Sequence, residues 1–354
     1  MPIAPPPEEL LEQPEMELME LFGRMRWLTE EAGFSGSLPS VWQCSDESQA
    51  IKKALFGYVF DCPVFNLGRV GALLDPNRLL TASRHGHDLI IHGGSHIGAR
   101  EEGGIGYVDR VHGSKATCCG MLGRLLDEYL QLYRRAAALI TLFRGVGGVK
   151  IEIPYKYLFH KPAQPVARIH IHLEKLADGE AVRDSSHGKV YRLNADFAAR
   201  HERLLEAVSA EREPIGELLG ADCFHFSKEL DHQSLDPRTL LEVSLFEFLP
   251  DIVTSTRPHR RLVDVNTWRQ FHRLASYLTD SFDSGERNIL VVAGRTIDHS
   301  IRRNTFVPQF GFWMEQGRAL QARYFGPQEV GELLRGAQVY RPPRSFLEYA
   351  GVPG

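Results

Sequence analysis

Apolar and polar residues follow two different periods along the chain, which predicts a mixture of helices and strands. Apolar residues recur at helical spacing over 8–33, a segment that contains Pro14 and ends at Gly33. Residues 114–143 show the same spacing over a longer and more strongly amphipathic stretch, with Ser114 as the expected cap. This second helix would carry Cys118 and Cys119 in its first turns. Further helices are predicted over 45–59, with Ser45 or Asp46 as the cap, and over 194–220, 237–249, 266–283 and 326–337.

Short apolar runs bounded by glycine or proline predict the strands. The run "LPSVWQC" ends at Cys44, and "HDLIIHGGSHIG" spans 87–98. Other strands are predicted over 149–159, 166–176, 288–299, 305–317 and 318–325. Strands and helices alternate in the first half of the chain and strands gather late, which favours an α/β fold. The segment 150–235 is the best candidate for an insertion.

Composition restricts the class of protein. The 354 residues are 43% hydrophobic and 24% charged, with a formal net charge of −4, which gives no reason to expect a nucleic-acid partner. The longest apolar runs, 136–143 and 288–294, are far shorter than the roughly 20 residues of a membrane span. The first residues lack the features of a signal peptide, so a cytoplasmic location is expected. We expect an N-terminal helical arm (1–34) followed by a single domain (35–354).

The five cysteines are too few and too scattered for a disulfide framework. They are Cys44, Cys62, Cys118, Cys119 and Cys223. An odd number of cysteines in a long chain without a signal peptide argues against systematic pairing. A free cysteine is most often a small buried apolar residue. A functional role must therefore rest on neighbouring groups.

Candidate chemistry lies at the ends of three predicted elements. Cys44 and Asp46 stand between a strand and a helix, His96 follows the second strand, and Cys119 lies at the start of the next helix. Such ends often meet at one edge of an α/β sheet. Two thiolates and an imidazole could hold Zn²⁺, with a fourth position for water or a carboxylate. The same residues could instead be a thiol nucleophile with its base, and Asp46 could be only a helix cap.

Four segments resemble one known family in order and spacing. They are "CSDE" (44–47), "FNLGRVGALL" (65–74), "GSHIGAREEGGIGYVDRVHGSKATCCGML" (94–122) and "ILVVAGRTIDH…NTFVPQFGFWMEQGR" (289–318). The chain resembles the limiting-CO2-inducible protein B/C family, a group of β-like, θ-class carbonic anhydrases, over roughly 35–145 and 237–325. The resemblance implies an α/β fold with a β-carbonic-anhydrase-like central sheet flanked by helices and an insertion in the middle of the chain.

The resemblance also implies a site and a reaction. The family's three motif elements map onto Cys44 with Asp46, onto His96, and onto Cys119. Cys44, His96 and Cys119 would hold Zn²⁺, and a zinc-bound hydroxide would attack CO2 to give bicarbonate, with Asp46 orienting it. Two thiolate ligands would favour activity at alkaline pH. Asp46 could instead bind the zinc directly, and Cys118 would be a packing neighbour.

Two positions depart from the family pattern. Ser95 stands where the family usually has proline, and Ser48 stands where β-class enzymes have an arginine beside the aspartate. An arginine that keeps Asp46 ionised would have to come from elsewhere. The candidates are Arg69, Arg84 and Arg100. Since the family contains inactive members, the alternative function is a catalytically silent inorganic-carbon sensor or complex partner that keeps the zinc site.

Several weaker expectations complete the picture. Apolar side chains would wall the CO2 pocket, and a histidine near its mouth could export the proton. The wall candidates are Phe65, Leu67 and Leu73, and the shuttle candidates, each expected to be an ordinary surface histidine, are His85, His87 and His112. His92 is interpreted as a core residue, and no second metal site is expected at 170–172 or 223–225. By analogy with β-class enzymes we expect a homodimer, with the helix at 8–33 crossing to the neighbour.

Overall fold

The chain folds into two compact units. The computed structural model describes residues 4–85, 87–99, 105–109, 115–159, 163–282, 285–300, 303–343 and 345–349. Unit 1 is formed by Met1–Gly123 together with His259–Gly354, and unit 2 by Arg124–Pro258. Unit 1 is thus assembled from both ends of the sequence, with unit 2 inserted between them. The segment 150–235, expected as an insertion, lies within unit 2.

Unit 1 is built on an eight-stranded sheet. Its strands are β1 (Met16–Glu17), β2 (Leu38–Trp42), β3 (Phe65–Asn66), β4 (Leu89–Gly93), β5 (His96–Gly98), β15 (Ile289–Ser300), β16 (Arg303–Met314) and β17 (Arg323–Phe325). The order is β1-β16-β15-β4-β2-β3, with β17 beside β16 and β5 beside β15. Strand β4 runs parallel to both β2 and β15, whereas β16 runs antiparallel to β15. The carboxyl ends of β2 and β4 therefore meet at one edge of the sheet.

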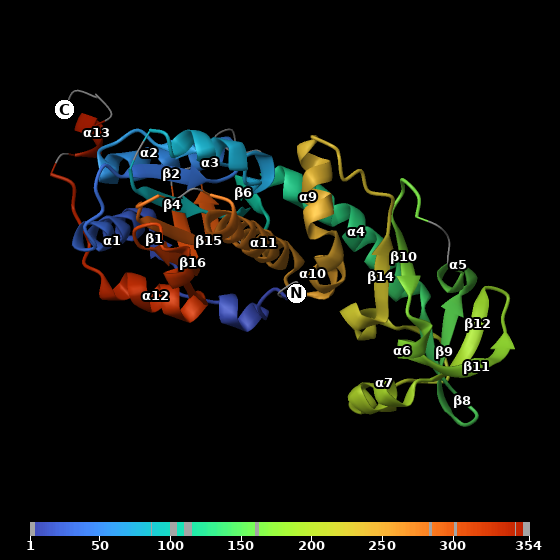
Figure 1. Ribbon diagram of the computed structural model, residues 1–354. Coiled ribbons are helices and arrows are strands. Elements are labelled where there is room, and N and C mark those ends of the chain that lie inside the picture. Colours follow the sequence, from blue (N-terminus) through green and yellow to red (C-terminus); the bar gives the residue numbers. More distant parts are fainter. Residues whose placement is uncertain are drawn as a thin grey trace. The chain divides into compact units, whose positions relative to one another are not determined.

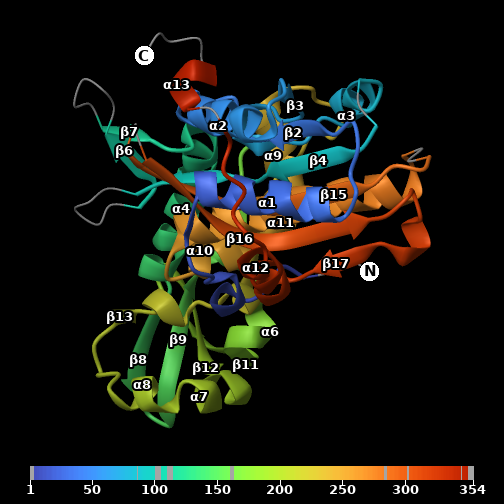
Figure 2. The same cartoon turned by 90° about the vertical axis from the view of Figure 1, so that its left-hand side faces the viewer.

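Helices cover both faces of this sheet. They are α1 (Leu18–Glu31), α2 (Ala50–Phe60), α3 (Pro76–Ala82), α11 (Pro258–Asp280), α12 (Pro327–Gly336) and α13 (Phe346–Tyr349). Figures 1 and 2 show α1 and α12 on one side of the sheet and α11 on the other. Apolar residues of α1, α2 and α12 form one core with β2, β4, β15 and β16. This confirms the predicted α/β architecture with a central sheet flanked by helices.

The N-terminal segment differs from its prediction. Residues Glu8–Leu11 form only a 3₁₀ turn, and α1 begins at Leu18, because Pro14 cannot continue a helix. Leu21 and Phe22 of α1 have no exposed surface and pack in the core of unit 1. The apolar face of α1 is thus buried in this chain's own interior, and α1 is part of unit 1. The homodimer stays a prediction.

The predicted helix over 114–143 is shorter at both ends. Lys115–Thr117 form strand β7, which pairs with β6 (Tyr107–Asp109), and α4 begins only at Gly120. Cys118 and Cys119 therefore precede the helix and do not lie in its first turns. The expected cap, Ser114, lies outside the described residues. Helix α4 ends at Leu139 because the following residues form β8 (Thr141–Gly145), which pairs with β9 (Gly148–Pro154).

Unit 2 contains two further sheets. One has the order β11-β12-β9-β8-β13, and the other is the pair β10-β14. The remaining strands are β10 (Arg168–Ile171), β11 (Ala177–Asp184), β12 (Gly188–Leu193), β13 (Glu213–Pro214) and β14 (Phe224–Ser227). The helices are α5 (Tyr155–Leu158), α6 (Leu173–Leu176), α7 (Ala195–Arg200), α8 (Glu202–Glu206), α9 (Pro237–Leu245) and α10 (Leu249–Thr254). The helix predicted over 194–220 is broken, because Glu213 and Pro214 pair with β8.

Candidate metal centre

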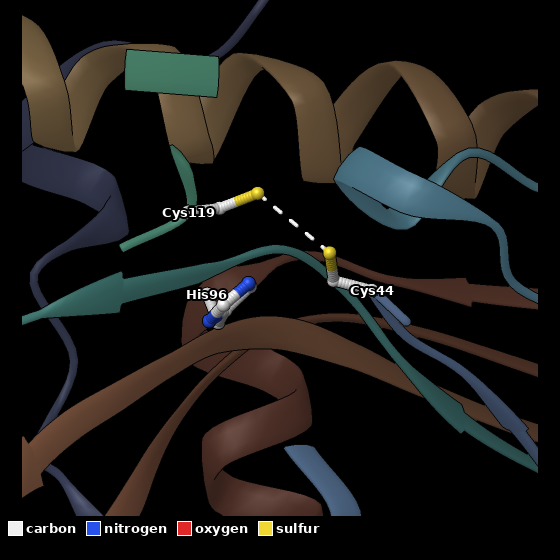
Figure 3. A group of neighbouring side chains, drawn as sticks. All are labelled: Cys44, His96 and Cys119. Atoms are coloured by element: carbon white, nitrogen blue, oxygen red, sulfur yellow. Dashed lines mark hydrogen bonds between the residues drawn. The ribbon is translucent and has the colours of Figure 1, made fainter. Parts of the chain in front are cut away.

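Three side chains named by the sequence come together at the carboxyl edge of the unit 1 sheet. Cys44 follows β2, His96 begins β5 just after β4, and Cys119 precedes α4. The two sulfur atoms, Cys44 Sγ and Cys119 Sγ, are 3.6 Å apart. One ligand atom from each of the three residues lies within 4.8 Å of the others, and all three residues are buried (Figure 3). The arrangement is that of a candidate metal centre.

The two ring nitrogens of His96 have different surroundings. Nδ1 lies 2.8 Å from Asp298 Oδ2, in hydrogen-bond distance. Nε2 is buried and has no hydrogen-bond partner among the described residues. Figure 3 shows one ring nitrogen of His96 turned toward the two sulfurs. A buried nitrogen without a partner is costly, so Nε2 is well placed to bind a ligand beside the thiols.

Asp298 is a residue of the site that sequence reasoning missed. It lies near the end of β15, which pairs in parallel with β5 so that Asp298 is opposite Gly98. Its carboxylate also accepts hydrogen bonds from Ser48 Oγ (3.0 Å) and Gln49 Nε2 (3.1 Å). Metal-binding histidines commonly donate their second N–H to such a carboxylate, which fixes the ring tautomer. The available signal was that Asp298 is the one carboxylate in β15, a strand whose first five residues are all apolar.

The charges in the site favour one thiolate. The hydrogen bond with Cys119 lowers the pKa of Cys44 to about 4; burial opposes this shift, and His96 adds to it. The same hydrogen bond, together with burial, raises the pKa of Cys119. The backbone N–H of Gly71 also donates to Cys44 Sγ at 3.2 Å. Burial lowers the pKa of His96, but Asp298 and the nearby thiols outweigh it and raise the pKa above its usual value.

Cys118 makes polar contacts within the site, whereas a packing neighbour would make only apolar ones. Its sulfur lies 3.0 Å from Asp298 Oδ2 and 3.2 Å from His96 Nδ1. Burial raises the pKa of the Cys118 thiol to about 11, so the thiol keeps its proton and can donate to Asp298. His96, Cys118 and Asp298 form a second set of close ligand atoms on the Nδ1 side of the ring. Hydrogen bonds already link these three groups.

The carboxylate of Asp46 accepts a hydrogen bond from within its own turn. Its Oδ1 accepts a hydrogen bond from the Ser48 backbone N–H at 3.0 Å, and the side chain is only half-buried. Asp46 has no ion pair with an arginine among the described residues; Arg69 pairs instead with Asp75 at 2.7 Å. Arg100, another candidate partner, lies outside the described residues. Ser48, at the position where β-class enzymes have arginine, turns its hydroxyl to the buried carboxylate of Asp298.

The weaker candidates are the side chains expected to wall a CO2 pocket and the nearby histidines. Leu67 and Leu73 are buried, whereas Phe65 is half-buried and its ring lies 5.2 Å from that of His85. His92 is fully buried among aromatic rings, which confirms its interpretation as a core residue. His87 Nδ1 lies 2.9 Å from Asp88 Oδ1. His112 lies outside the described residues.

The histidines of unit 2 also cluster. His172 Nε2 lies 2.8 Å from His225 Nδ1, and His170 stacks on the ring of His225. Within the described ranges, the groups that bring three potential metal ligands together are the two that share His96.

None of the helices in the described part of the chain has the length and apolar character needed to cross a membrane.

Comparison with known proteins gives a likeness in fold. No protein-family model and no curated protein matches the sequence. The crystal structure of PtLCIB4, a homolog of the limiting CO2-inducible protein LCIB, matches with a TM-score of 0.52 at 12% sequence identity, over 88% of this chain and 94% of that chain. A histidine-to-alanine mutant of PtLCIB4 gives a TM-score of 0.52 at 13% identity, over 86% of this chain and 91% of that chain. The chain therefore has an LCIB-like fold.

Proposed function

We propose that this protein is a zinc-dependent carbonic anhydrase that converts CO2 reversibly to bicarbonate. The observation that carries the proposal is the buried Nε2 of His96, which lies beside the sulfurs of Cys44 and Cys119 and has no hydrogen-bond partner among the described residues. Two sulfurs and one imidazole nitrogen suit zinc, and three protein ligands leave the open position typical of a catalytic site. The likeness in fold to PtLCIB4 supports the same interpretation.

Residues of the chain would prepare the site for the metal. Asp298 holds the Nδ1 proton of His96 and thereby leaves Nε2 free as a ligand. The N–H of Gly71 donates to Cys44 Sγ and favours its thiolate form. When bound, zinc would acidify a water molecule and so supply the nucleophile that CO2 hydration needs.

Asp46 would orient the nucleophile. It follows Cys44 by two residues, and the N–H of Ser48 holds one of its carboxylate oxygens. The other oxygen would accept a hydrogen bond from the nucleophilic water and turn its lone pair toward CO2. This role requires the ionised carboxylate, because only that form acts solely as an acceptor.

Stopped-flow CO2 hydration by zinc-loaded protein at pH 7 and pH 8.5 tests the proposal. We expect wild-type protein to exceed the uncatalysed rate, most clearly at the higher pH. Cys44→Ser should lose both zinc and activity. Asp46→Asn should keep zinc and lose about a hundredfold in rate, because a small misplacement of a reacting group can cost about that much. Wild-type protein with one zinc per chain and no rate above background at either pH would contradict the proposal.

A second candidate is a silent inorganic-carbon sensor that keeps the zinc. Ser48 favours this candidate, because it stands where β-class enzymes have an arginine beside the aspartate. Asp46 accordingly has no arginine partner among the described residues. Zinc-loaded protein would then bind bicarbonate without accelerating CO2 hydration.

A thiol hydrolase that uses Cys119 makes a different prediction: Cys119 would react with an alkylating agent in the zinc-loaded protein. Under the zinc proposal, alkylation should require prior chelation.

A further inference from the structure

A pocket of about 240 Å³ lies wholly within unit 2. Its walls come from α4, α5 and β10, and they combine an apolar floor with basic side chains. The apolar residues include Leu132, Tyr157, Ala167 and Ile169, and the last three are buried. The basic residues are Arg135, Lys156 and Arg168. The volume lies just below the range of roughly 300–1,000 Å³ that is typical of ligand pockets, so only a small molecule would fit.

The three basic side chains have no acidic counterpart. No aspartate or glutamate lines the pocket, and none of the three forms an ion pair within the ranges that the structure describes. Among the described residues, Arg168 donates to the side-chain oxygen of Gln164, and Lys156 Nζ lies 4.7 Å from the centre of the Tyr157 ring. By contrast, Arg212 in the same unit pairs with Glu152. The pocket thus concentrates positive charge that the described residues leave uncompensated.

The basic groups also repel one another. Burial, together with the positive charge of Arg135, lowers the pKa of Lys156. An anion placed between these groups would remove the repulsion and gain charge-assisted hydrogen bonds. Guanidinium groups such as Arg135 and Arg168 match the planar geometry of a carboxylate.

The floor of the pocket distinguishes between anions. Tyr157 and Ile169 offer apolar surface that a phosphate or sulfate ion would leave uncovered, and phosphate oxygens turned toward it would lose their hydrogen bonds with water. A carboxylate with a short apolar body can satisfy both parts of the pocket at once.

We propose that this pocket binds a small organic carboxylate, whose charged end pairs with Arg135, Lys156 and Arg168 and whose apolar body lies on Tyr157 and Ile169. This binding function belongs to unit 2 alone and goes beyond CO2 hydration. It would give the inserted unit a ligand of its own.

Isothermal titration calorimetry of the full chain with hexanoate tests the proposal. We expect one hexanoate site per chain, and binding of acetate and of the neutral analogue hexanamide should be weaker by at least about tenfold. Arg168→Gln and Lys156→Gln should each weaken hexanoate binding by about tenfold, which corresponds to one charge-assisted hydrogen bond. Arg134→Gln is the matched control, because Arg134 is exposed on α4 beside Arg135 but does not line the pocket.

Three results would overturn the proposal. They are the absence of hexanoate binding to correctly folded protein, binding of sulfate as tight as that of hexanoate, and equal losses in Arg134→Gln and Arg168→Gln. Circular dichroism of each variant separates loss of binding from loss of fold. Because the readout is calorimetric, the outcome does not depend on whether the protein hydrates CO2.

Discussion

Two buried aspartates lie at opposite ends of the same pair of parallel strands and bind different partners. Asp88 precedes β4, and its carboxylate accepts hydrogen bonds from the backbone N–H groups of Ser35 (2.7 Å) and Asn288 (2.8 Å). Asp298 lies near the other end, on β15, and its contacts are with side chains, among them His96 and Ser48. Both carboxylates are almost fully buried.

The difference separates a carboxylate that holds backbone segments together from one that contacts the candidate metal centre. Burial alone would raise the pKa of Asp88, but the backbone amides of Asn288 and Ser35 outweigh it and lower the pKa. Asp88 thereby ties together the segments that enter β2, β4 and β15. Burial would likewise raise the pKa of Asp298, and there the hydrogen bond and charge of His96 outweigh it. Asp298 thus orients the side chain of a potential metal ligand, whereas Asp88 holds backbone segments together.

Of the two aspartates, Asp298 should have the larger effect on zinc binding when it is replaced by asparagine. The amide would no longer offer His96 a charged acceptor, so the ring would lose its fixed orientation. We expect zinc affinity to fall by about 10- to 100-fold, measured by competition with a chelating dye. Asp88→Asn is the matched control and should bind zinc as wild type does. Equal zinc affinities in Asp298→Asn and wild type would contradict the positioning role of Asp298.

Asp88→Asn should lower the stability of the protein and leave zinc binding unchanged. Its new NH2 group would face a backbone N–H donor, leaving buried donors without acceptors. The free energy of unfolding of the metal-free protein should fall by about 1–3 kcal/mol, measured by urea denaturation. An unchanged unfolding midpoint would show that Asp88 does not tie the strands together.

Acid should remove the contribution of Asp88. Because its folded pKa is lowered, the stabilisation is fully present above the unfolded value of about 3.9 and is lost as the pH falls through the folded pKa. The difference in unfolding free energy between wild type and Asp88→Asn should therefore be constant from pH 6 to about pH 5 and shrink below about pH 4. Urea denaturation at a series of pH values measures it, and a difference that grew in acid would have the wrong sign.

The smallest effect is expected for Cys118→Ser. A serine hydroxyl can donate the same hydrogen bond to Asp298, so zinc affinity should stay within about threefold of wild type. Cys119→Ser, one residue further on, should lose zinc binding altogether. Metal analysis of both variants after dialysis makes the comparison. Similar zinc losses in the two variants would assign Cys118 to the ligands.

Local sequence patterns predicted the elements that carry Cys44 and His96, because apolar runs ending at glycine or polar residues have a clear local signature. They did not predict Asp298 as a partner of His96, since the two residues are 202 positions apart and meet only through the β5–β15 register. Cys118 and Cys119 were placed in a helix because their neighbours continue its apolar period. Pairing of β7 with β6 overrode that local preference.

The division of unit 1 between the two ends of the sequence has a consequence for biosynthesis. Cys44, His96 and Cys119 all lie in the first 123 residues, whereas Asp298 follows Cys119 by about 180 residues. At roughly 5–20 residues per second, a ribosome needs about 9 to 36 seconds to cover that interval. During most of this time strand β15, which orients His96, does not yet exist. Under the proposed function, zinc would therefore find the finished site only after β15 has been made.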